Sequence, residues 1–239
     1  MKAATGHVGI AAVTAEGAAL CYKTICVEGA SLLGPHAHPE VSLHGNSLGD
    51  YMACFNRDDW QGVAALLLDS AEKLAKMGAD FLICPANMPH KAMPHVEPRS
   101  PLPWLHIADV VAAEAAQRGF RRVAVTGTSP LVESAIYPER LAARGVECLR
   151  PSAAERAECT RIIYEELVRS IMKPESVGYL QRMIERLKGE GADAVILGCT
   201  EFPLVLNDEN SALPTLDSTR LLARAALRRA VEGAAVAGA

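Results

Sequence analysis

The amino-acid sequence predicts an α/β protein made of two pseudo-symmetric three-layer domains with mainly parallel sheets. Apolar runs of strand length alternate with longer segments of helical periodicity, and this alternation is typical of parallel sheets covered by helices. The 239 residues, 50% hydrophobic and 22% charged, suffice for one large or two small domains. An internal repeat favours two domains.

The expected elements follow one another in a regular βα order. The strand candidates are residues 7–13, 41–46, 80–86, 103–108, 121–127, 194–199 and 213–217. The helix candidates are residues 60–77, 108–118, 137–144, 154–170 and 176–190. Two of these helices run into a glycine that leads directly into a strand, as expected of a helix C-cap.

The internal repeat joins the ends of two strands. The stretch GAD at residues 78–80 recurs at residues 191–193, and the same offset carries Ala86 onto Cys199 and Asn87 onto Thr200. The repeat predicts two similar α/β halves whose equivalent strands end in equivalent loops.

The repeat also sets the expected domain boundaries and the place of the site. We expect residues 1–104 plus 214–239 to form the first domain and residues 105–213 the second. Ligands of open parallel sheets bind beyond the carboxyl ends of the strands. Residues 86–90 and 199–203 are therefore expected to face each other across a cleft between the domains, which would hold the active site.

Composition narrows the kind of partner. The net charge of −4 comes from interspersed acidic and basic residues, so we expect neither nucleic acid nor a membrane as partner. No apolar run reaches the ~18 residues that span a bilayer, and the N-terminus lacks a signal-peptide pattern. The seven cysteines and seven histidines lack the spacing of a metal site. We expect a cytoplasmic protein with reduced thiols and a small-molecule ligand.

Several motifs together resemble one enzyme family. They are GCTEFPLVL at residues 198–206, the pattern of Pro85, Asn87 and His90, LPWLHIADV at residues 102–110, and Gly127 followed by Thr128. In this order they are similar to the cofactor-independent aspartate/glutamate racemase family. The resemblance implies two pseudo-symmetric α/β domains, a homodimer, and catalysis without pyridoxal phosphate or metal.

The resemblance also implies where the catalytic groups lie. Typical members place one catalytic cysteine just before the asparagine and another in the G-C-T-E loop. Cys199 holds the second place and is the expected proton donor or acceptor, whereas Ala86 holds the first and offers neither acid nor base. His90 and Cys84 are the candidates for a second base, and each also has a purely structural interpretation.

Short polar residues at strand ends are candidates for binding the substrate carboxylate. They are Asn87, Thr128, Ser129 and Thr200. Lys173 falls where aspartate-type members have a lysine. Aspartate-type members tend to have an arginine near residue 51, where this chain has Tyr51. The first loop of family racemases is typically a pair of glycines followed by methionine, whereas the corresponding loop of this chain ends at Val13. These departures, with Ala86, predict a reshaped substrate pocket.

Three functions fit these residues. The first is a cofactor-independent amino-acid racemase or epimerase in which Cys199 transfers a proton at the carbon next to a carboxylate. The second is an arylmalonate-type decarboxylase, because loss of carbon dioxide creates the carbanion without a base and one thiol then suffices to protonate it. The third is a homologue that binds a small carboxylic acid or amino acid without turnover.

Overall fold

The computed structural model describes the backbone of residues 5–237 and the side chains of residues 5–233. The chain divides into two compact units: the first runs to Ile107 and resumes at Thr219, and the second is Ala108–Ser218. The sequence places these divisions a few residues earlier, after 104 and 213. The fold class is confirmed, because each unit is a parallel four-stranded sheet flanked by helices.

The sheet of the first unit has the strand order β2-β1-β3-β4. Its strands are β1 (Val8–Ala12), β2 (Val41–Gly45), β3 (Phe81–Ile83) and β4 (Trp104–Leu105). Val8 lies opposite both Val41 of β2 and Phe81 of β3, so the central strand is bonded on both sides. Every residue of β1 is buried, as expected of a strand covered on both faces.

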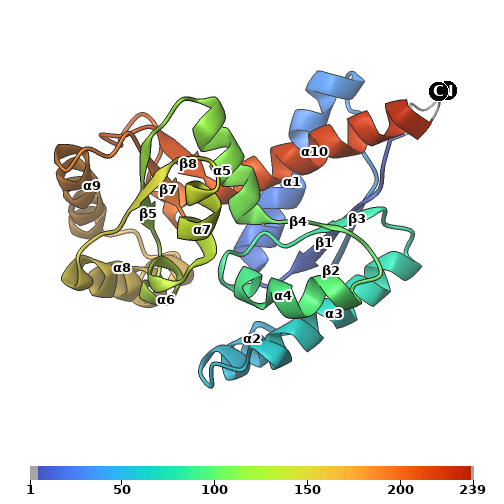
Figure 1. Ribbon diagram of the computed structural model, residues 1–239, viewed down its shortest axis with the longest axis horizontal. Coiled ribbons are helices and arrows are strands. Elements are labelled where there is room, and N and C mark those ends of the chain that lie inside the picture. The colour runs from blue at the N-terminus through green and yellow to red at the C-terminus, as the bar shows by residue number, and fades with distance from the viewer. Residues whose placement is uncertain (1–4, 238–239) are drawn as a thin grey trace. The chain divides into compact units, whose positions relative to one another are not determined.

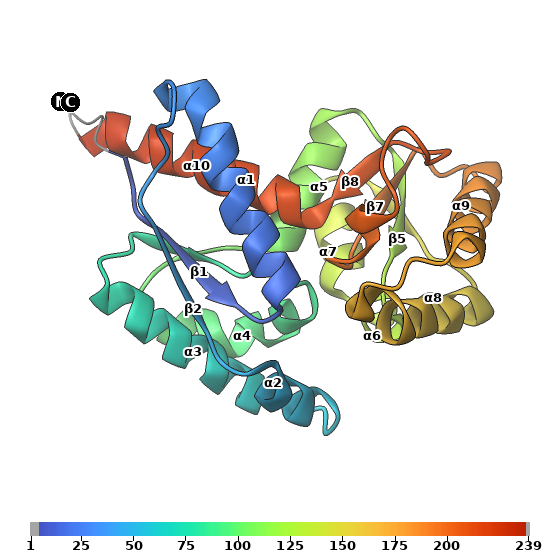
Figure 2. The same ribbon diagram turned by 180° about the vertical axis from the view of Figure 1, so that it is seen from behind.

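Helices cover both faces of this first sheet. They are α1 (Ala15–Leu33), α2 (Leu48–Phe55), α3 (Trp60–Lys76), η1 (Met88–Ala92), α4 (Met93–Val96), η2 (Glu97–Arg99) and α10 (Ser218–Ala237). Figures 1 and 2 show α1 and α10 together on one face and α3 on the other. Arg224 of α10 forms an ion pair with Glu28 of α1 at 2.8 Å.

The second unit repeats the same strand order, β6-β5-β7-β8. Its strands are β5 (Arg122–Thr126), β6 (Glu147–Leu149), β7 (Ala194–Leu197) and β8 (Thr215–Asp217). Its helices are α5 (Ile107–Gln117), α6 (Ser129–Glu133), α7 (Ile136–Ala142), α8 (Ala153–Glu165), η3 (Leu167–Arg169), α9 (Pro174–Gly189) and η4 (Phe202–Leu204). Helices α8 and α9 lie on one face of this sheet, and α5 and α7 on the other (Figures 1 and 2).

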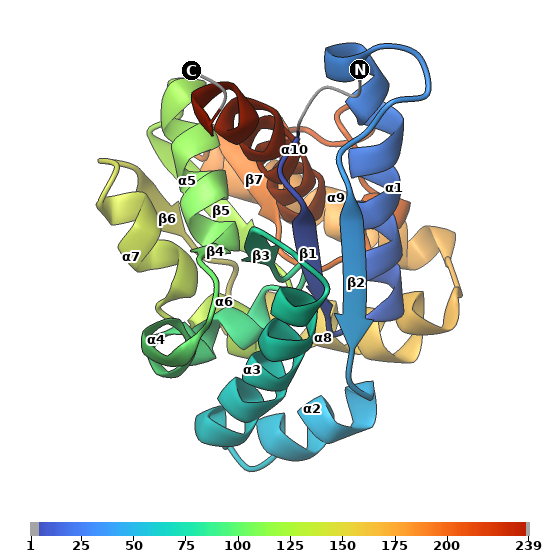
Figure 3. The ribbon, with the colours of Figure 1, turned by 90° about the vertical axis from the view of Figure 1, so that its right-hand side faces the viewer.

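One aspartate in each unit performs the same task, which makes the internal repeat visible in the structure. Asp80 accepts a hydrogen bond from the backbone N–H of His7 at 2.7 Å, just before β1. Asp193 accepts from the backbone N–H groups of Arg121 and Arg122, at the start of β5. Each aspartate therefore anchors the amino end of the central strand of its own sheet (Figure 3 shows β1 with its neighbour β2).

All seven predicted strands are present, and the one that was missed is β6. It is a three-residue edge strand that is partly exposed, so it lacks the buried apolar run that marks the others. The helix predicted over residues 154–170 ends at Glu165, because Glu166 leaves the helical region with φ −121° and ψ −71°. The short η3 follows, and it ends at Ser170, which adopts a left-handed conformation with φ 58°. In the described part of the chain, no helix has both the length and the apolar character needed to span a membrane.

Candidate functional site

The loop after β7 is held by an unusually close approach of backbone. Gly198 follows the strand and donates its N–H to the carbonyl of Thr126 in β5 at 3.0 Å. A Cβ at Gly198 would lie 2.5 Å from that carbonyl oxygen and 2.7 Å from a methyl group of Leu131. Only glycine fits here, and Cys199 is thereby fixed directly at the carboxyl end of the strand.

Gly198→Ala should therefore lower both stability and activity. The methyl group meets backbone that cannot move away, and overpacking of this kind costs about 1–3 kcal/mol. We expect the melting temperature to fall by roughly 2–4 °C for each kcal/mol, as measured by circular dichroism. Gly189→Ala is the matched control, because a Cβ there meets nothing within 4 Å. Equal melting temperatures for the two variants would contradict this account of Gly198.

Cys199 forms a compact hydrogen-bonded group with the two residues that follow it. Its Sγ donates to Oε2 of Glu201 at 2.8 Å, and Oγ1 of Thr200 donates to the same oxygen at 2.9 Å. Thr200 and Glu201 are buried, while Cys199 is half-buried. The group is thus a thiol that is paired with a buried carboxylate and still reaches the surface of its unit.

The surroundings of Cys199 keep its thiol protonated in the free protein. Burial raises the pKa of the Cys199 thiol well above its usual range, and the charge of Glu201 and its acceptance of the thiol hydrogen raise it further. Backbone hydrogen bonds from Glu201 and Thr200 act in the opposite direction. A thiolate formed here would consequently have two backbone donors, and the carboxylate beside it could take the proton.

The predicted polar pair Thr128 and Ser129 follows the neighbouring strand β5, which ends at Thr126. Thr128 is buried and stands at the N-cap of α6, where its side chain makes no capping bond. The N–H of Ser129 donates to Oγ1 of Thr160 in α8 at 2.8 Å, and the two hydroxyl oxygens are 3.0 Å apart. Because β5 and β7 are paired, these residues lie at the same edge of the sheet as Cys199.

Lys173 lies at the N-cap of α9 and is paired with an acid of its own unit. Its Nζ is 3.4 Å from Oε1 of Glu166, whose side chain is only 2% exposed. Arg161 and Ser176 also donate to this carboxylate. The positive charge of Lys173 is therefore already partly satisfied before any substrate binds.

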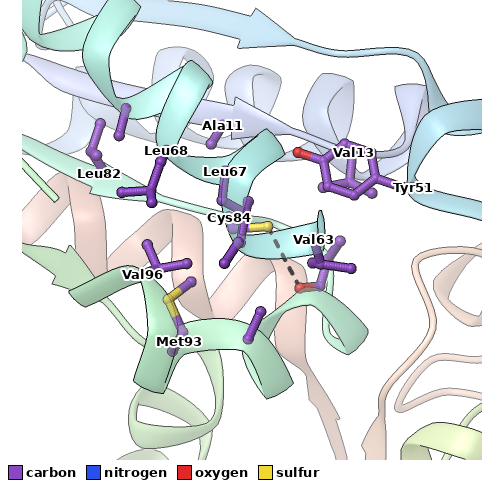
Figure 4. Close-up of a cluster of buried hydrophobic side chains, with 14 of the residues drawn as sticks. Ala11, Val13, Tyr51, Val63, Leu67, Leu68, Leu82, Cys84, Met93 and Val96 are labelled. Atoms are coloured by element: carbon purple, nitrogen blue, oxygen red, sulfur yellow. Dashed lines mark hydrogen bonds between the residues drawn. The ribbon is translucent and has the colours of Figure 1, made fainter. Parts of the chain in front are cut away.

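In the first unit, the loop after β3 is apolar at Ala86, the position where the resemblance implies a cysteine in typical members. Ala86 is 7% exposed and belongs to the hydrophobic core cluster of this unit. Cys84 is fully buried in the same cluster, and its Sγ lies 3.8 Å from the carbonyl oxygen of Ala86 (Figure 4). Burial raises the pKa of the Cys84 thiol to about 12, an environment typical of a core cysteine.

The next residues of this loop are held by a buried histidine. Nε2 of His90 lies 3.0 Å from the carbonyl oxygen of Cys84, so this nitrogen carries the hydrogen and donates it. The ring packs edge-on against His106, with centroids 4.4 Å apart. The carbonyl of Asn87, itself buried, accepts the N–H of His90. His90 therefore shapes the loop, and this contact supports its structural interpretation.

Tyr51 and Val13 lie in the same apolar cluster as Ala86 and Cys84. Figure 4 shows the Tyr51 ring beside Val13, with Cys84 and Val63 nearby. Tyr51 is fully buried, and burial raises the pKa of its phenol. None of these four side chains carries a charge, so this part of the first unit presents an apolar environment.

A pocket of about 470 Å³ opens at the carboxyl ends of β1 and β2 in the first unit. Its walls include Val13, Ala18, Tyr22, Leu43 and Leu48, and its other polar side chains are those of Thr14 and Asn46. No lysine, arginine, histidine or acidic residue lines it. Among the residues that the structure describes, no group of three or more His, Cys, Asp or Glu side chains is arranged to hold a metal ion.

Comparison with known proteins assigns the chain to a family. Residues 11–226 match the model of the Asp/Glu/Hydantoin racemase family. The chain belongs to this family. The broad specificity amino-acid racemase RacX of Bacillus subtilis (strain 168) is 29% identical over 161 residues, which cover 66% of this chain and 68% of RacX.

Solved structures agree with this family assignment. A Yersinia pestis protein provisionally assigned as an Asp/Glu racemase is 30% identical with a TM-score of 0.88, covering 95% of this chain and 99% of that one. PH1733, an aspartate racemase homologue from Pyrococcus horikoshii OT3, is 28% identical with a TM-score of 0.82, covering 98% and 100%. Glutamate racemase from Francisella tularensis in complex with D-glutamate shares the fold, at 14% identity and a TM-score of 0.69, covering 96% and 82%.

Within this racemase-family chain, the residue that sequence reasoning missed is Glu201. It is the acceptor of both Cys199 and Thr200. The signal was present in the motif itself, because the acid of G-C-T-E stands two residues after the cysteine. The turn after Cys199 folds this side chain back onto the thiol, and alternation along an extended strand would not reveal that contact.

Proposed function

We propose that this member of the racemase family is a cofactor-independent amino-acid racemase or epimerase that uses Cys199 as its acid and base. The observation that carries the proposal is the 2.8 Å hydrogen bond from the Cys199 thiol to Glu201 at a strand end. A thiol beside a carboxylate can both give and take a proton. Proton transfer at the carbon next to a carboxylate needs such a group.

In the proposed reaction, protons move between Cys199, Glu201, the α-carbon of the substrate and a second acid. In one direction Cys199 passes its proton to Glu201, and the resulting thiolate takes the α-proton of the substrate. The electron pair of the broken C–H bond moves onto the carboxylate oxygens of the substrate. A second acid then delivers a proton to the opposite face of the α-carbon. In the other direction the Cys199 thiol supplies that proton, and Glu201 returns one to the sulfur.

The second acid or base is sought among His90, Cys84 and a bound water. The buried Cys84 thiol, with its pKa raised to about 12, is a poor base near neutral pH. His90 carries an imidazole, the side chain that most often acts as a general acid or base. We therefore place His90 ahead of Cys84 for this role.

The substrate carboxylate would be bound by short polar groups at strand ends. Thr128, Ser129 and Thr200 of the second unit are the groups proposed here, and Asn87 stays a prediction from the sequence. Hydroxyl, amide and backbone N–H groups bind a carboxylate without a formal positive charge.

We further propose that the substrate side chain carries no second carboxylate. Lys173 is paired with Glu166, and the residues near the family's arginine and first cysteine positions, Tyr51 and Ala86, are uncharged and buried in an apolar cluster. The pocket at the ends of β1 and β2 is likewise mostly apolar. Aspartate and glutamate are thus expected to be poorer substrates than amino acids with uncharged side chains.

Decarboxylation of a disubstituted malonate remains the second candidate. The observation that favours it is Ala86, which leaves the first-unit loop without an accessible thiol. In this reaction the C–C bond to the leaving carbon dioxide breaks, and its electron pair stays on the substrate as an enolate. The Cys199 thiol then donates the one proton that is required.

Chiral chromatography of reaction mixtures, with measurement of released carbon dioxide, separates these functions. The purified protein is incubated with D- and L-amino acids and with substituted malonates. Formation of the opposite enantiomer supports the racemase, whereas carbon dioxide from a malonate, without enantiomer formation from any amino acid, would replace it with the decarboxylase. The expected homodimer and cytoplasmic location stay predictions, and analytical ultracentrifugation tests the former.

A further inference from the structure

Tyr164 lies in the last turn of α8. This helix is hydrogen-bonded to Ser129, in the segment that follows β5. The residue of α8 that makes this contact is Thr160, whose hydroxyl is hydrogen-bonded to both the N–H and the hydroxyl of Ser129. Residues four apart on a helix lie on the same face. Tyr164 therefore follows Thr160 on the face that is turned toward the strand ends, and Figures 1 and 2 show α8 beside α6 there.

The end of α8 also packs near the Cys199 loop. Cys199 is packed against the hydrophobic cluster of the second unit, which includes Ile163 and Leu167 on either side of Tyr164. Burial raises the pKa of the Tyr164 phenol, and negative charge on Cys199 and on Glu201 raises it further. The phenol therefore stays protonated.

Tyr164 is positioned to meet a ligand instead of filling the core. It is 47% exposed, whereas Tyr137 of the same unit is fully buried. The backbone around it is anchored, because Glu166 is buried and accepts hydrogen bonds from Ser176 at 2.7 Å and Arg161 at 2.8 Å. A half-exposed phenol on an anchored turn can donate a hydrogen bond without reorganising the chain.

We propose that Tyr164 is a further catalytic residue, whose phenol donates a hydrogen bond to the carboxylate of the substrate bound at Cys199. The inference rests on the proposed function and names a residue of the same site. When the α-proton leaves, negative charge develops on the carboxylate oxygens. A protonated phenol that donates to them stabilises that charge more than it stabilises the ground state.

Tyr164→Phe tests this proposal, with Tyr179→Phe as the matched control. Tyr179 is on α9 of the same unit and packs against the same apolar cluster. Loss of one such donor typically costs about 10²–10³-fold in kcat. We expect this loss for Tyr164→Phe with KM little changed, and wild-type kinetics for Tyr179→Phe. Both variants should keep the wild-type melting temperature and the wild-type rate of Cys199 alkylation by iodoacetamide.

Wild-type kcat in Tyr164→Phe would overturn the proposal. A lowered melting temperature together with altered alkylation would overturn it as well, because it would show a structural role. A binding readout separates failure of the proposal from failure of the proposed function. Pyrrole-2-carboxylate has a trigonal carbon next to its carboxylate, and its affinity is measured by isothermal titration calorimetry.

If the wild type binds this probe without racemising any amino acid, the proposed function fails. A tenfold or greater loss of affinity in Tyr164→Phe alone would then still support Tyr164 as the carboxylate donor. Equal affinity of Tyr164→Phe and Tyr179→Phe for the probe would contradict the Tyr164 proposal. The proposal would also be contradicted if the wild type neither bound the probe nor racemised any amino acid.

Discussion

Cys199→Ala is expected to abolish enantiomer formation from every amino acid that the wild type converts. The substitution removes the only side chain of the G-C-T-E loop that we assign to the α-proton. A positioned acid or base contributes typically 10²–10⁴-fold, and because the thiol is the group that exchanges the α-proton we expect a loss of about 10³-fold. The rate of enantiomer formation, measured by chiral chromatography, checks this.

Cys148→Ala provides the matched control for this variant. Cys148 belongs to β6 of the same unit, is half-buried, and takes no part in the Cys199 group. It should retain wild-type turnover. Binding of pyrrole-2-carboxylate should survive in Cys199→Ala, because the carboxylate is held by other groups. Turnover in Cys199→Ala within tenfold of the wild type would remove Cys199 from the mechanism.

Glu201→Gln is expected to slow racemisation by roughly 10²-fold, the lower end of the range for a proton-transferring group. It should simultaneously make Cys199 easier to alkylate. The sign follows from the two effects of Glu201 on the thiol: its charge and its acceptance of the thiol hydrogen both raise the pKa of Cys199. Glutamine removes the charge, so that pKa falls and more thiolate is present at a given pH.

The rate of alkylation by iodoacetamide between pH 7 and 10 measures this shift. The rate profile of Glu201→Gln should move to lower pH than that of the wild type. Glu209→Gln, an exposed acid of the same unit, should leave both the profile and the turnover unchanged. An unshifted profile in Glu201→Gln would show that the carboxylate does not control the thiol.

The two-unit fold could be predicted from the sequence because the same local physics appears twice. The GAD stretches mark where a helix ends and a central strand begins, and the structure shows why. Gly78 and Gly191 adopt positive φ angles of 88° and 93°. The aspartates two residues later accept hydrogen bonds from the backbone N–H groups of the residues just before β1 and β5. Buried strands such as β1 and β7 carry unbroken apolar runs, which periodicity detects.

Helices α1, α2 and α10 were not among the predicted helices, and α1 contains a residue that is unfavourable in a helix but required by packing. Gly29 lowers helix propensity by about 1 kcal/mol relative to alanine. A Cβ at this position would lie 2.8 Å from Cβ of His38 and 2.9 Å from the carbonyl oxygen of Ala37. A tertiary contact thus requires glycine at this position, and helix prediction from neighbouring residues alone cannot take that contact into account.

The candidate site could be predicted as a set of residues but not as a set of contacts. The motifs pointed to Cys199, Thr200 and the residues around Ala86. They did not reveal that Glu201 accepts the thiol hydrogen, or that Lys173 is engaged by Glu166. Both contacts depend on turns in which a side chain folds back, and residue type alone does not specify such turns.

Proton nuclear magnetic resonance in heavy water tests the central claim most directly. Wild-type protein and Cys199→Ala are incubated in parallel with the same amino acid in its L form. We predict that the α-proton signal disappears with the wild type while the deuterated D enantiomer accumulates, and that both changes are absent with Cys199→Ala. Equal loss of the signal with both proteins, or formation of the enantiomer without deuterium, would contradict proton transfer by Cys199.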